Sequence, residues 1–107
     1  MEKLWDLLIL KLQGSPQEFP TTPMTNKAPV WFRVHTDGGV IYVSNARDHK
    51  PSSKIKGQRN LTYDEFERMY PIYLRRLAGK SVSAEAQQAS YNQVYWYSLI
   101  KHCIPQT

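Results

Sequence analysis

The chain has 107 residues, 41% of them hydrophobic, a composition that argues against a disordered protein and predicts one folded domain over residues 1–107. The net charge of +5 and the pI near 9.4 favour partners that carry negative charge, chiefly nucleic acid. The lone Cys103 excludes an internal disulfide framework and a multi-cysteine zinc site, and it is typical of a reducing, cytoplasmic setting.

Residues 1–13 predict a short helix that is apolar on nearly every side. Leu4, Leu8 and Leu12 form one stripe along it, and Trp5 and Ile9 form the next. Such a helix needs cover on more than one face. Either it wedges into the core of its own chain, or a homodimer forms through Leu4, Trp5 and Leu8 or through the hairpin described below.

This apolar run is not expected to cross or enter a membrane. A bilayer-spanning helix requires about 20 apolar residues, and Asp6 already interrupts the run. Glu2 also disrupts the basic start that a signal peptide needs. We therefore expect a cytoplasmic protein without a membrane anchor.

A β-hairpin is the clearest local prediction, after a connector with three prolines at residues 14–28 and at the start of an α+β core over 29–103. In VWFRVHTDGGVIYV, Asp37-Gly38 predicts a two-residue type I′ turn, because both central positions of that turn need positive φ. The expected register follows from this turn. It pairs Thr36 with Gly39, His35 with Val40, Val34 with Ile41, Arg33 with Tyr42, and Phe32 with Val43.

Strand alternation divides the hairpin side chains between two faces. The core face is expected to carry Val30, Phe32, Val34, Ile41 and Val43. The opposite side, which we name the outer hairpin face, would carry Trp31, Arg33, His35, Val40 and Tyr42. Its aromatic and basic side chains predict a platform on which unpaired bases can stack. Alternatively, a helix or a partner subunit covers this face and its aromatics serve packing alone.

A helix is expected to begin at Tyr63. Thr62 and Glu65 fit a capping box, and Leu61 and Phe66 fit a hydrophobic staple. The predicted apolar face carries Phe66, Tyr70, Tyr73, Leu74 and Leu77. Pro71 is expected to kink or split this helix, and Gly79 to end it.

A final helix is expected from a cap at Ser83 to about Cys103. Asn92 and Gln93 would lie near its middle and need hydrogen-bond partners if buried. The resulting order of α, β, β, α, α predicts an α+β fold. It consists of a short N-terminal helix, an antiparallel β-hairpin to which Lys54 to Lys56 can add a short third strand, and two C-terminal helices packed on the sheet.

The stretch RDHKPSSKIKGQRNL, Arg47 to Leu61, follows the hairpin and holds five basic residues and one acid. Pro51, Ser52 and Ser53 are small residues that let backbone amides approach an anion, so the stretch is a candidate phosphate grip. A solvated connection is the alternative. We name residues 47–59 the basic loop, and its cations are Arg47, Lys50, Lys54, Lys56 and Arg59.

Within this loop, DHKP followed by NL resembles the opening of the HNH nuclease pattern over about fourteen residues. The resemblance implies metal-assisted hydrolysis with His49 as the base that activates water. The pattern departs from that family, since the helix after Asn60 carries Asp64, Glu65 and Glu67 but no His, and the usual glycine pair is absent. Neighbouring sequence does not complete a metal-ligand set.

These patterns together predict a small, non-enzymatic cytoplasmic protein that needs no cofactor or metal and binds DNA or RNA. The expected binding residues are Trp31, Arg33, His35, Tyr42, Arg47, Lys50, Lys54, Lys56 and Arg59. The alternative is a protein-interaction module, either a homodimer or an inhibitor-type partner protein. A third hypothesis is an HNH-like metal nuclease with an incomplete motif.

Overall fold

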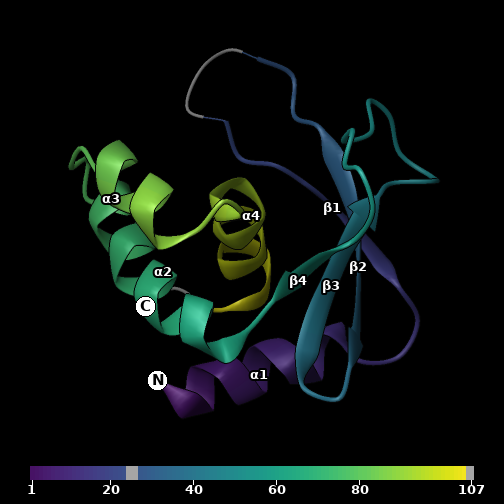
Figure 1. Cartoon of the computed structure of the whole chain (residues 1–107), viewed down its shortest axis with the longest axis horizontal. Helices are drawn as coiled ribbons and strands as arrows, with labels where there is room; N and C mark the ends of the chain where they lie inside the picture. Colours follow the sequence, from purple (N-terminus) through teal and green to yellow (C-terminus); the bar gives the residue numbers. More distant parts are fainter. Residues whose placement is uncertain (24–26, 106–107) are drawn as a thin grey trace.

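A helix, four strands and three further helices follow one another along the chain in a computed structural model that describes residues 1–23 and 27–105 (Figure 1). The elements are α1 (Glu2–Leu12), β1 (Gln17–Pro20), β2 (Trp31–Asp37), β3 (Val40–Asn45), β4 (Arg59–Leu61), α2 (Tyr63–Leu77), α3 (Ser83–Ala89) and α4 (Gln93–Cys103).

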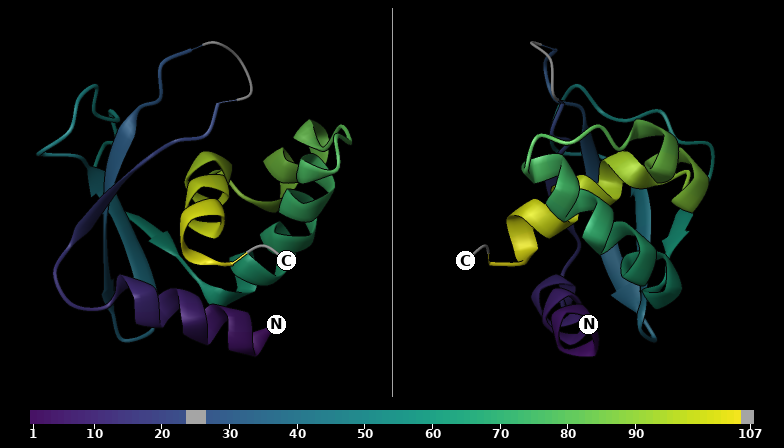
Figure 2. Two further views of the ribbon diagram at one scale, coloured as in Figure 1. Left: turned by 180° about the vertical axis from the view of Figure 1, so that it is seen from behind. Right: turned by 90° about the vertical axis from the view of Figure 1, so that its left-hand side faces the viewer.

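The strands form one antiparallel sheet in the order β1-β2-β3-β4, so each strand pairs with its neighbour in sequence. Helices α2, α3 and α4 lie on one side of this sheet, and α1 packs against α4 and β2 (Figures 1 and 2). The predicted α+β fold is confirmed: an N-terminal helix, an antiparallel sheet, and C-terminal helices that pack on it. No helix in the described part of the chain is long and apolar enough to span a membrane.

The core lies between the sheet and the helices. Four side chains of the predicted core face, Phe32, Val34, Ile41 and Val43, are buried, whereas Val30 precedes β2 and is half-buried. The helices contribute large side chains that are also fully buried, namely Leu8, Leu12, Phe66, Met69, Trp96, Leu99 and Ile100. The division of the hairpin into a core face and an outer face was therefore predicted correctly.

The register of the hairpin differs from the prediction by two residues. Asp37 pairs with Val40, so the turn consists of Gly38 and Gly39, with φ of 59° and 81°. A glycine pair adopts both positive φ angles without the steric cost that Asp37 would meet in the first of them. The observed pairs are Thr36 with Ile41, His35 with Tyr42, Val34 with Val43, Arg33 with Ser44, and Phe32 with Asn45. A shift of two preserves which side chains face the core.

The two additional strands lie outside the predicted positions. Strand β1 falls within the segment that was expected to be a connector, and β4 pairs with β3 through Ile41 and Leu61. The short third strand that Lys54 to Lys56 could have added is not formed, because the Asn45 side chain hydrogen-bonds the backbone of Ile55. Asn45 Oδ1 accepts the Ile55 N–H at 2.7 Å, and Asn45 Nδ2 donates to the Ile55 carbonyl at 3.0 Å.

Helix α2 begins at Tyr63 as predicted, but the Thr62 side chain makes no capping hydrogen bond. Pro71 lies within the helix and does not split it. The chain leaves α2 through Gly79, whose φ is 83°, and the Lys80 N–H donates to the Arg75 carbonyl at 3.0 Å. This arrangement is a Schellman motif, so Gly79 ends the helix as expected.

The apolar face of α2 is rotated from the predicted one. Met69 and Ile72 are buried with Phe66 and Tyr73, whereas Tyr70 is half-buried. Two leucines that were expected in the core are exposed, Leu74 by 43% and Leu77 by 58%. The spacing of Phe66, Met69 and Tyr73 is the usual i, i+3, i+7 stripe of a helix packed on a core.

The predicted final helix is divided into α3 and α4, and Val82 rather than Ser83 occupies the N-cap position of α3. The break lies where several polar groups donate hydrogen bonds to Glu65. Glu65 Oε1 accepts the Trp96 indole N–H at 3.0 Å, the Ser90 hydroxyl, and Asn92 Nδ2 at 3.4 Å. The carboxylate that was expected in the capping box thus satisfies buried donors of the next segments instead.

Helix α1 is held within its own chain. Trp5, Leu8 and Leu12 are buried, and the Trp5 ring packs against Phe66 and Trp96 at centroid distances of 5.5 and 6.2 Å. Of the two arrangements expected for this helix, the intramolecular one is present. Leu4, the third residue of the expected dimer contact, packs half-buried against the same core.

Candidate functional site

The outer hairpin face is the side of the sheet that carries no helix (Figures 1 and 2). Trp31, Arg33, His35, Val40 and Tyr42 all lie on it and are half-buried, as expected for side chains that alternate with the core residues. Strand β1 adds Glu18 beside Arg33. The helix cover that was the alternative for this face is therefore absent from the described residues, although the basic loop folds over one end of it.

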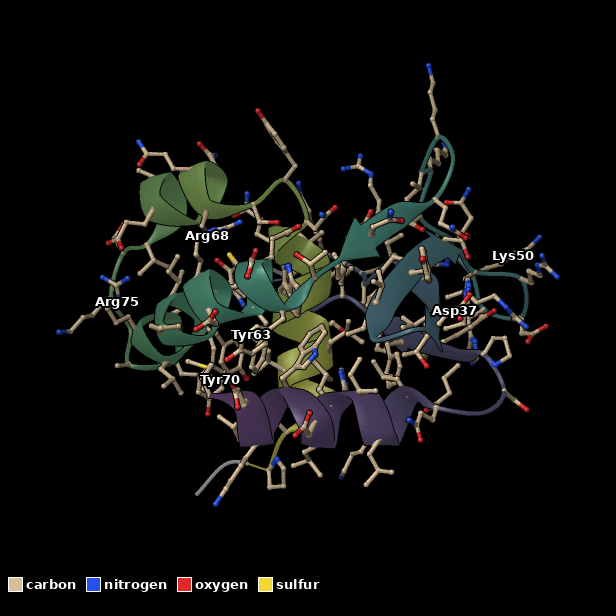
Figure 3. All side chains as sticks on the ribbon, turned by 60° about the horizontal axis from the view of Figure 1, so that its bottom comes forward. Asp37, Lys50, Tyr63, Arg68, Tyr70 and Arg75 are labelled. Atoms are coloured by element: carbon tan, nitrogen blue, oxygen red, sulfur yellow. The ribbon has the colours of Figure 1, made fainter. Side chains whose placement is uncertain are left out.

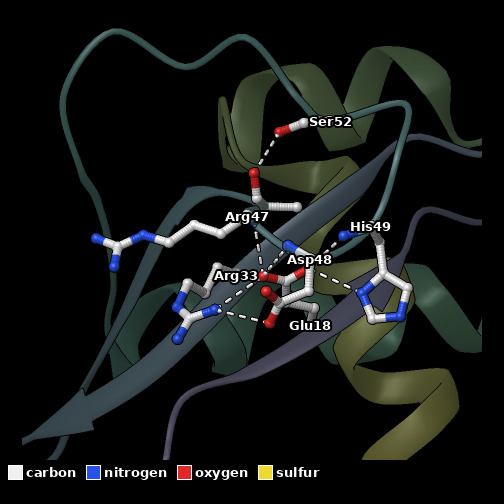
Figure 4. Close-up of polar contacts among 7 residues, drawn as sticks. Glu18, Arg33, Arg47, Asp48, His49 and Ser52 are labelled. Carbon is white, nitrogen blue, oxygen red and sulfur yellow. Dashed lines mark hydrogen bonds and ion pairs between the residues drawn. The ribbon is translucent and has the colours of Figure 1, made fainter.

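A buried carboxylate holds that loop in place. Glu18 is 3% exposed at its side chain and accepts the consecutive backbone N–H groups of Arg47 at 2.8 Å, Asp48 at 3.2 Å and His49 at 3.1 Å (Figure 4). The imidazole Nδ1 of His49 lies 2.8 Å from Glu18 Oε1, and Arg33 Nη1 donates to Glu18 Oε2 at 2.9 Å. Backbone amides at the start of the loop therefore bind an anion, and this anion is the carboxylate of Glu18 in the same chain.

The pKa of Glu18 reflects these contacts. Burial raises the pKa, but the hydrogen bonds from Arg47, His49, Asp48 and Arg33 outweigh it and bring the pKa from its ordinary 4.5 down to about 2. Hydrogen bonds to the charged form stabilise that form. The carboxylate is therefore ionised at every pH at which the protein is expected to work, and its charge offsets that of Arg33.

Two further attachments fix the middle of the basic loop. The Trp31 N–H donates to the Pro51 carbonyl and the Ser53 N–H donates to the Trp31 carbonyl, both at 2.8 Å. Asn45 accepts the Ser53 hydroxyl at 3.1 Å in addition to its bonds with Ile55. The backbone of this loop is thus pinned to the sheet at three places, so its charged side chains project from a fixed frame.

The five cations of the basic loop are all exposed. In the described residues none of them forms an ion pair with a carboxylate, and Arg59 donates only to the Asn92 side-chain oxygen, at 3.3 Å. Lys50 lies at the outer edge of the molecule (Figure 3). By contrast, Arg33 is bound to Glu18 and lies 3.5 Å from Asp48 Oδ2, so most of its charge is compensated.

The aromatic side chains of the outer hairpin face are arranged in two stacks. The Trp31 ring stacks on His49 with centroids 3.9 Å apart and an interplanar angle of 11°. His35 stacks on Tyr42 with centroids 5.1 Å apart and an angle of 19°. One face of each ring is therefore already used, and a base could stack only on the remaining face.

The residues that resemble the HNH pattern do not adopt its arrangement. His49 binds Glu18 and stacks on Trp31, whereas Asn60 lies in β4, paired with Tyr42, and not in a loop. No group of three or more His, Cys, Asp or Glu side chains in the described residues is placed to hold a metal ion. A ligand set around His49 is not completed by the helix that follows.

Sequence reasoning missed Glu18 and Asn45, which position the loop. Glu18 lies in a segment that was expected to be a connector, and its partners lie between 15 and 31 residues away. Gln17 and Glu18 are both polar, so the segment lacks the alternation of polar and apolar residues that would predict a strand. Comparison with protein-family models, with curated proteins and with solved structures found no match to this chain.

Proposed function

We propose that the protein binds nucleic acid without catalysis, with the basic loop as the phosphate-binding element. The observation that carries the proposal is the set of five exposed cations, none in an ion pair in the described residues, on a loop whose backbone is fixed to the sheet. Because the loop backbone is already fixed, binding has to order only the cationic side chains, and phosphate contacts supply most of the affinity of such proteins.

From the contacts of the nine expected residues, we assign them different roles. Arg47, Lys50, Lys54, Lys56 and Arg59 would contact phosphates. Arg33 would act through Glu18 by holding the loop, because its guanidinium is already engaged. Of the aromatics, His35 and Tyr42 are the better stacking partners for a base, since Trp31 also supports His49 and the loop backbone.

Fluorescence anisotropy with a short labelled single strand and the matching duplex tests the proposal. Four phosphate contacts predict that log affinity falls with log salt at a slope near −3 for the single strand, and more steeply for the duplex. A triple variant, Lys50→Gln, Lys54→Gln and Lys56→Gln, should reduce the slope by about 2.

The matched control removes the same charge elsewhere, as Lys3→Gln, Lys80→Gln and Lys101→Gln, three exposed lysines on or after helices. This control should bind nearly as tightly as the unchanged protein. If the control loses as much affinity as the loop variant, net charge and not the loop is responsible. Absence of binding by the unchanged protein at about 50 mM salt would refute the proposal.

A second candidate function, a protein-interaction module, is favoured by Leu74 and Leu77. These leucines lie three positions apart on α2, so they share one face of the helix, and they are 43% and 58% exposed. Exposed apolar side chains that lie close together are typical of an interface. Light scattering after size-exclusion chromatography would detect a homodimer, and Leu74→Gln with Leu77→Gln should abolish it without changing nucleic-acid binding.

A further inference from the structure

A cavity of about 380 Å³ lies where residues 21–23 and the basic loop meet α4. Its volume is at the lower end of the range in which proteins hold small molecules. The apolar part of its wall consists of Pro23, Val30, Val94, Tyr95 and Tyr97. None of the five residues of the outer hairpin face lines the cavity, which shares Ser53 and Lys54 with the basic loop.

Two cations line this cavity, Arg76 and Lys54, and none of the described residues that line it is an Asp or a Glu. Arg76 is held in one orientation. Its Nη2 donates to the Thr22 carbonyl at 3.1 Å, and its guanidinium carbon lies 4.1 Å from the centre of the Tyr97 ring. In the described residues it forms no ion pair, so an oriented guanidinium keeps its full positive charge beside an apolar wall.

Thr22 supplies an independent observation. Its Oγ1 atom is buried and has no hydrogen-bond partner among the described residues, although Thr22 lines the cavity. A buried hydroxyl without a partner is rare because it loses its bonds to water and gains none. A polar group bound beside Arg76 would give this hydroxyl a partner.

The tyrosines make the wall suitable for a flat, apolar group. Burial raises the pKa of both Tyr95 and Tyr97, with Arg59 and Arg76 respectively opposing the rise, so both phenols stay neutral at physiological pH. They bring no negative charge that would compete for Arg76. Aromatic side chains favour stacked or edge-on contact with another ring.

We propose that this cavity is a binding site for a small carboxylate with a flat apolar body, in which the carboxylate pairs with Arg76 and the body lies against Val94 and Tyr95. A planar guanidinium matches a planar carboxylate through two parallel hydrogen bonds, which makes a carboxylate the best fit for this single fixed arginine. This inference goes beyond nucleic-acid binding and does not depend on it.

Isothermal titration calorimetry with 2-naphthoate and with its neutral counterpart 2-naphthamide tests the proposal. We expect saturable binding of the naphthoate and binding of the naphthamide that is at least about tenfold weaker, since only the former carries charge for Arg76. Arg76→Gln should weaken naphthoate binding by about tenfold or more. Arg75→Gln is the matched control, because the neighbouring Arg75 pairs with Glu85 and does not line the cavity.

Two further variants keep the test independent of folding defects. Lys54→Gln changes an exposed side chain and should weaken naphthoate binding by about threefold through loss of charge alone. Thr22→Val removes the unpaired hydroxyl, so it should leave the free protein equally or more stable while weakening binding. A loss of affinity without a loss of stability is not expected if Thr22 has only a structural role.

Amide chemical shifts in nuclear magnetic resonance spectra would locate the ligand, with the largest changes expected at Val94 and Tyr95. Equal binding of naphthoate and naphthamide, or an Arg76→Gln variant that binds as tightly as the Arg75→Gln control, would overturn the proposal. So would a folded protein that binds no naphthoate at millimolar concentration. Oligonucleotide binding should be unchanged in Arg76→Gln, which separates failure of this site from failure of the basic loop.

Discussion

Glu18 and His49 are hydrogen-bonded across 31 positions of the chain, with Glu18 Oε1 lying 2.8 Å from His49 Nδ1 and 3.1 Å from the His49 backbone nitrogen. Through this contact, an acidic side chain holds the most basic segment of the protein in place. Because the carboxylate occupies three successive amides, the loop has a fixed backbone and leaves its cations free to act outward.

We expect Glu18→Gln to lower the free energy of unfolding by about 2 to 3 kcal/mol, because hydrogen bonds to a charged group are lost and Arg33 is left without its main partner. Chemical denaturation measures this directly. Glu85→Gln is the matched control, since its ion pair with Arg75 is about half exposed and should be worth less than about 1 kcal/mol. Equal effects of the two substitutions would mean that Glu18 is not the anchor of the loop.

The pKa of Glu18 also predicts a dependence of stability on pH. Since the folded-state pKa of about 2 lies below the ordinary 4.5, the contribution of this carboxylate is complete above about pH 4.5 and is lost as pH falls toward 2. The adjacent loop is exposed, so we expect screening to limit the loss to about 1 to 2 kcal/mol. The difference between the stability curves of the unchanged protein and Glu18→Gln isolates this carboxylate. A difference that stays constant from pH 5 to pH 2 would contradict the shift.

The fold was predicted from local signals. The prediction is wrong where contacts between residues far apart in the sequence determine the local structure. Alternation in residues 30–43 identified both hairpin faces. The turn, however, consists of Gly38 and Gly39, and not of Asp37 and Gly38 as predicted. The long final helix is divided because Glu65, 25 residues earlier, binds Ser90 and competes with helical continuity. Periodicity in one segment contains no information about such a partner.

The sequence does not reveal how the residues of the candidate site are arranged. The cations of the basic loop are exposed. An anion was expected at the backbone amides around Pro51, Ser52 and Ser53, whereas the amides that bind one are those of Arg47, Asp48 and His49, and the anion is Glu18. Strand β1 places Glu18 opposite Arg33, and a strand of four residues between prolines is too short for alternation to identify. The pinned loop therefore could not be distinguished from a solvated one by its sequence.

Glu65→Ala should destabilise the protein by about 1 to 3 kcal/mol, because the indole N–H of the fully buried Trp96 and the Ser90 hydroxyl would lose their acceptor. Thermal or urea unfolding monitored by circular dichroism measures the loss. Asp64→Ala, on the exposed first turn of the same helix, should cost less than about 1 kcal/mol. A cost for Glu65→Ala no greater than for Asp64→Ala would show that the buried donors find other acceptors.

Cys103 should resist alkylation in the folded protein. Burial raises its pKa to about 11, against a small opposing effect of Lys11, and the residue is 4% exposed. At pH 8 only about one thiol in a thousand would be the reactive thiolate. Mass spectrometry after iodoacetamide treatment should therefore find little modification without denaturant and complete modification in urea. Rapid modification of the folded protein would show that α4 opens at its C-terminal end.

Substitutions of Lys50 and Tyr42 separate charge from stacking at the proposed nucleic-acid surface. Lys50→Gln should reduce the slope of log affinity against log salt by about 0.7 for a single strand, because one phosphate contact and its counterions are lost. Tyr42→Ala should instead weaken single-strand binding by about 1 to 3 kcal/mol and leave the slope unchanged, since stacking on the free face of its ring releases no counterions. Tyr91→Ala is the matched control, because Tyr91 is 90% exposed in the turn between α3 and α4, outside the outer hairpin face. If Tyr42→Ala behaves like Tyr91→Ala while Lys50→Gln changes the slope, the protein holds the phosphate backbone alone and the stack of His35 on Tyr42 has no part in binding.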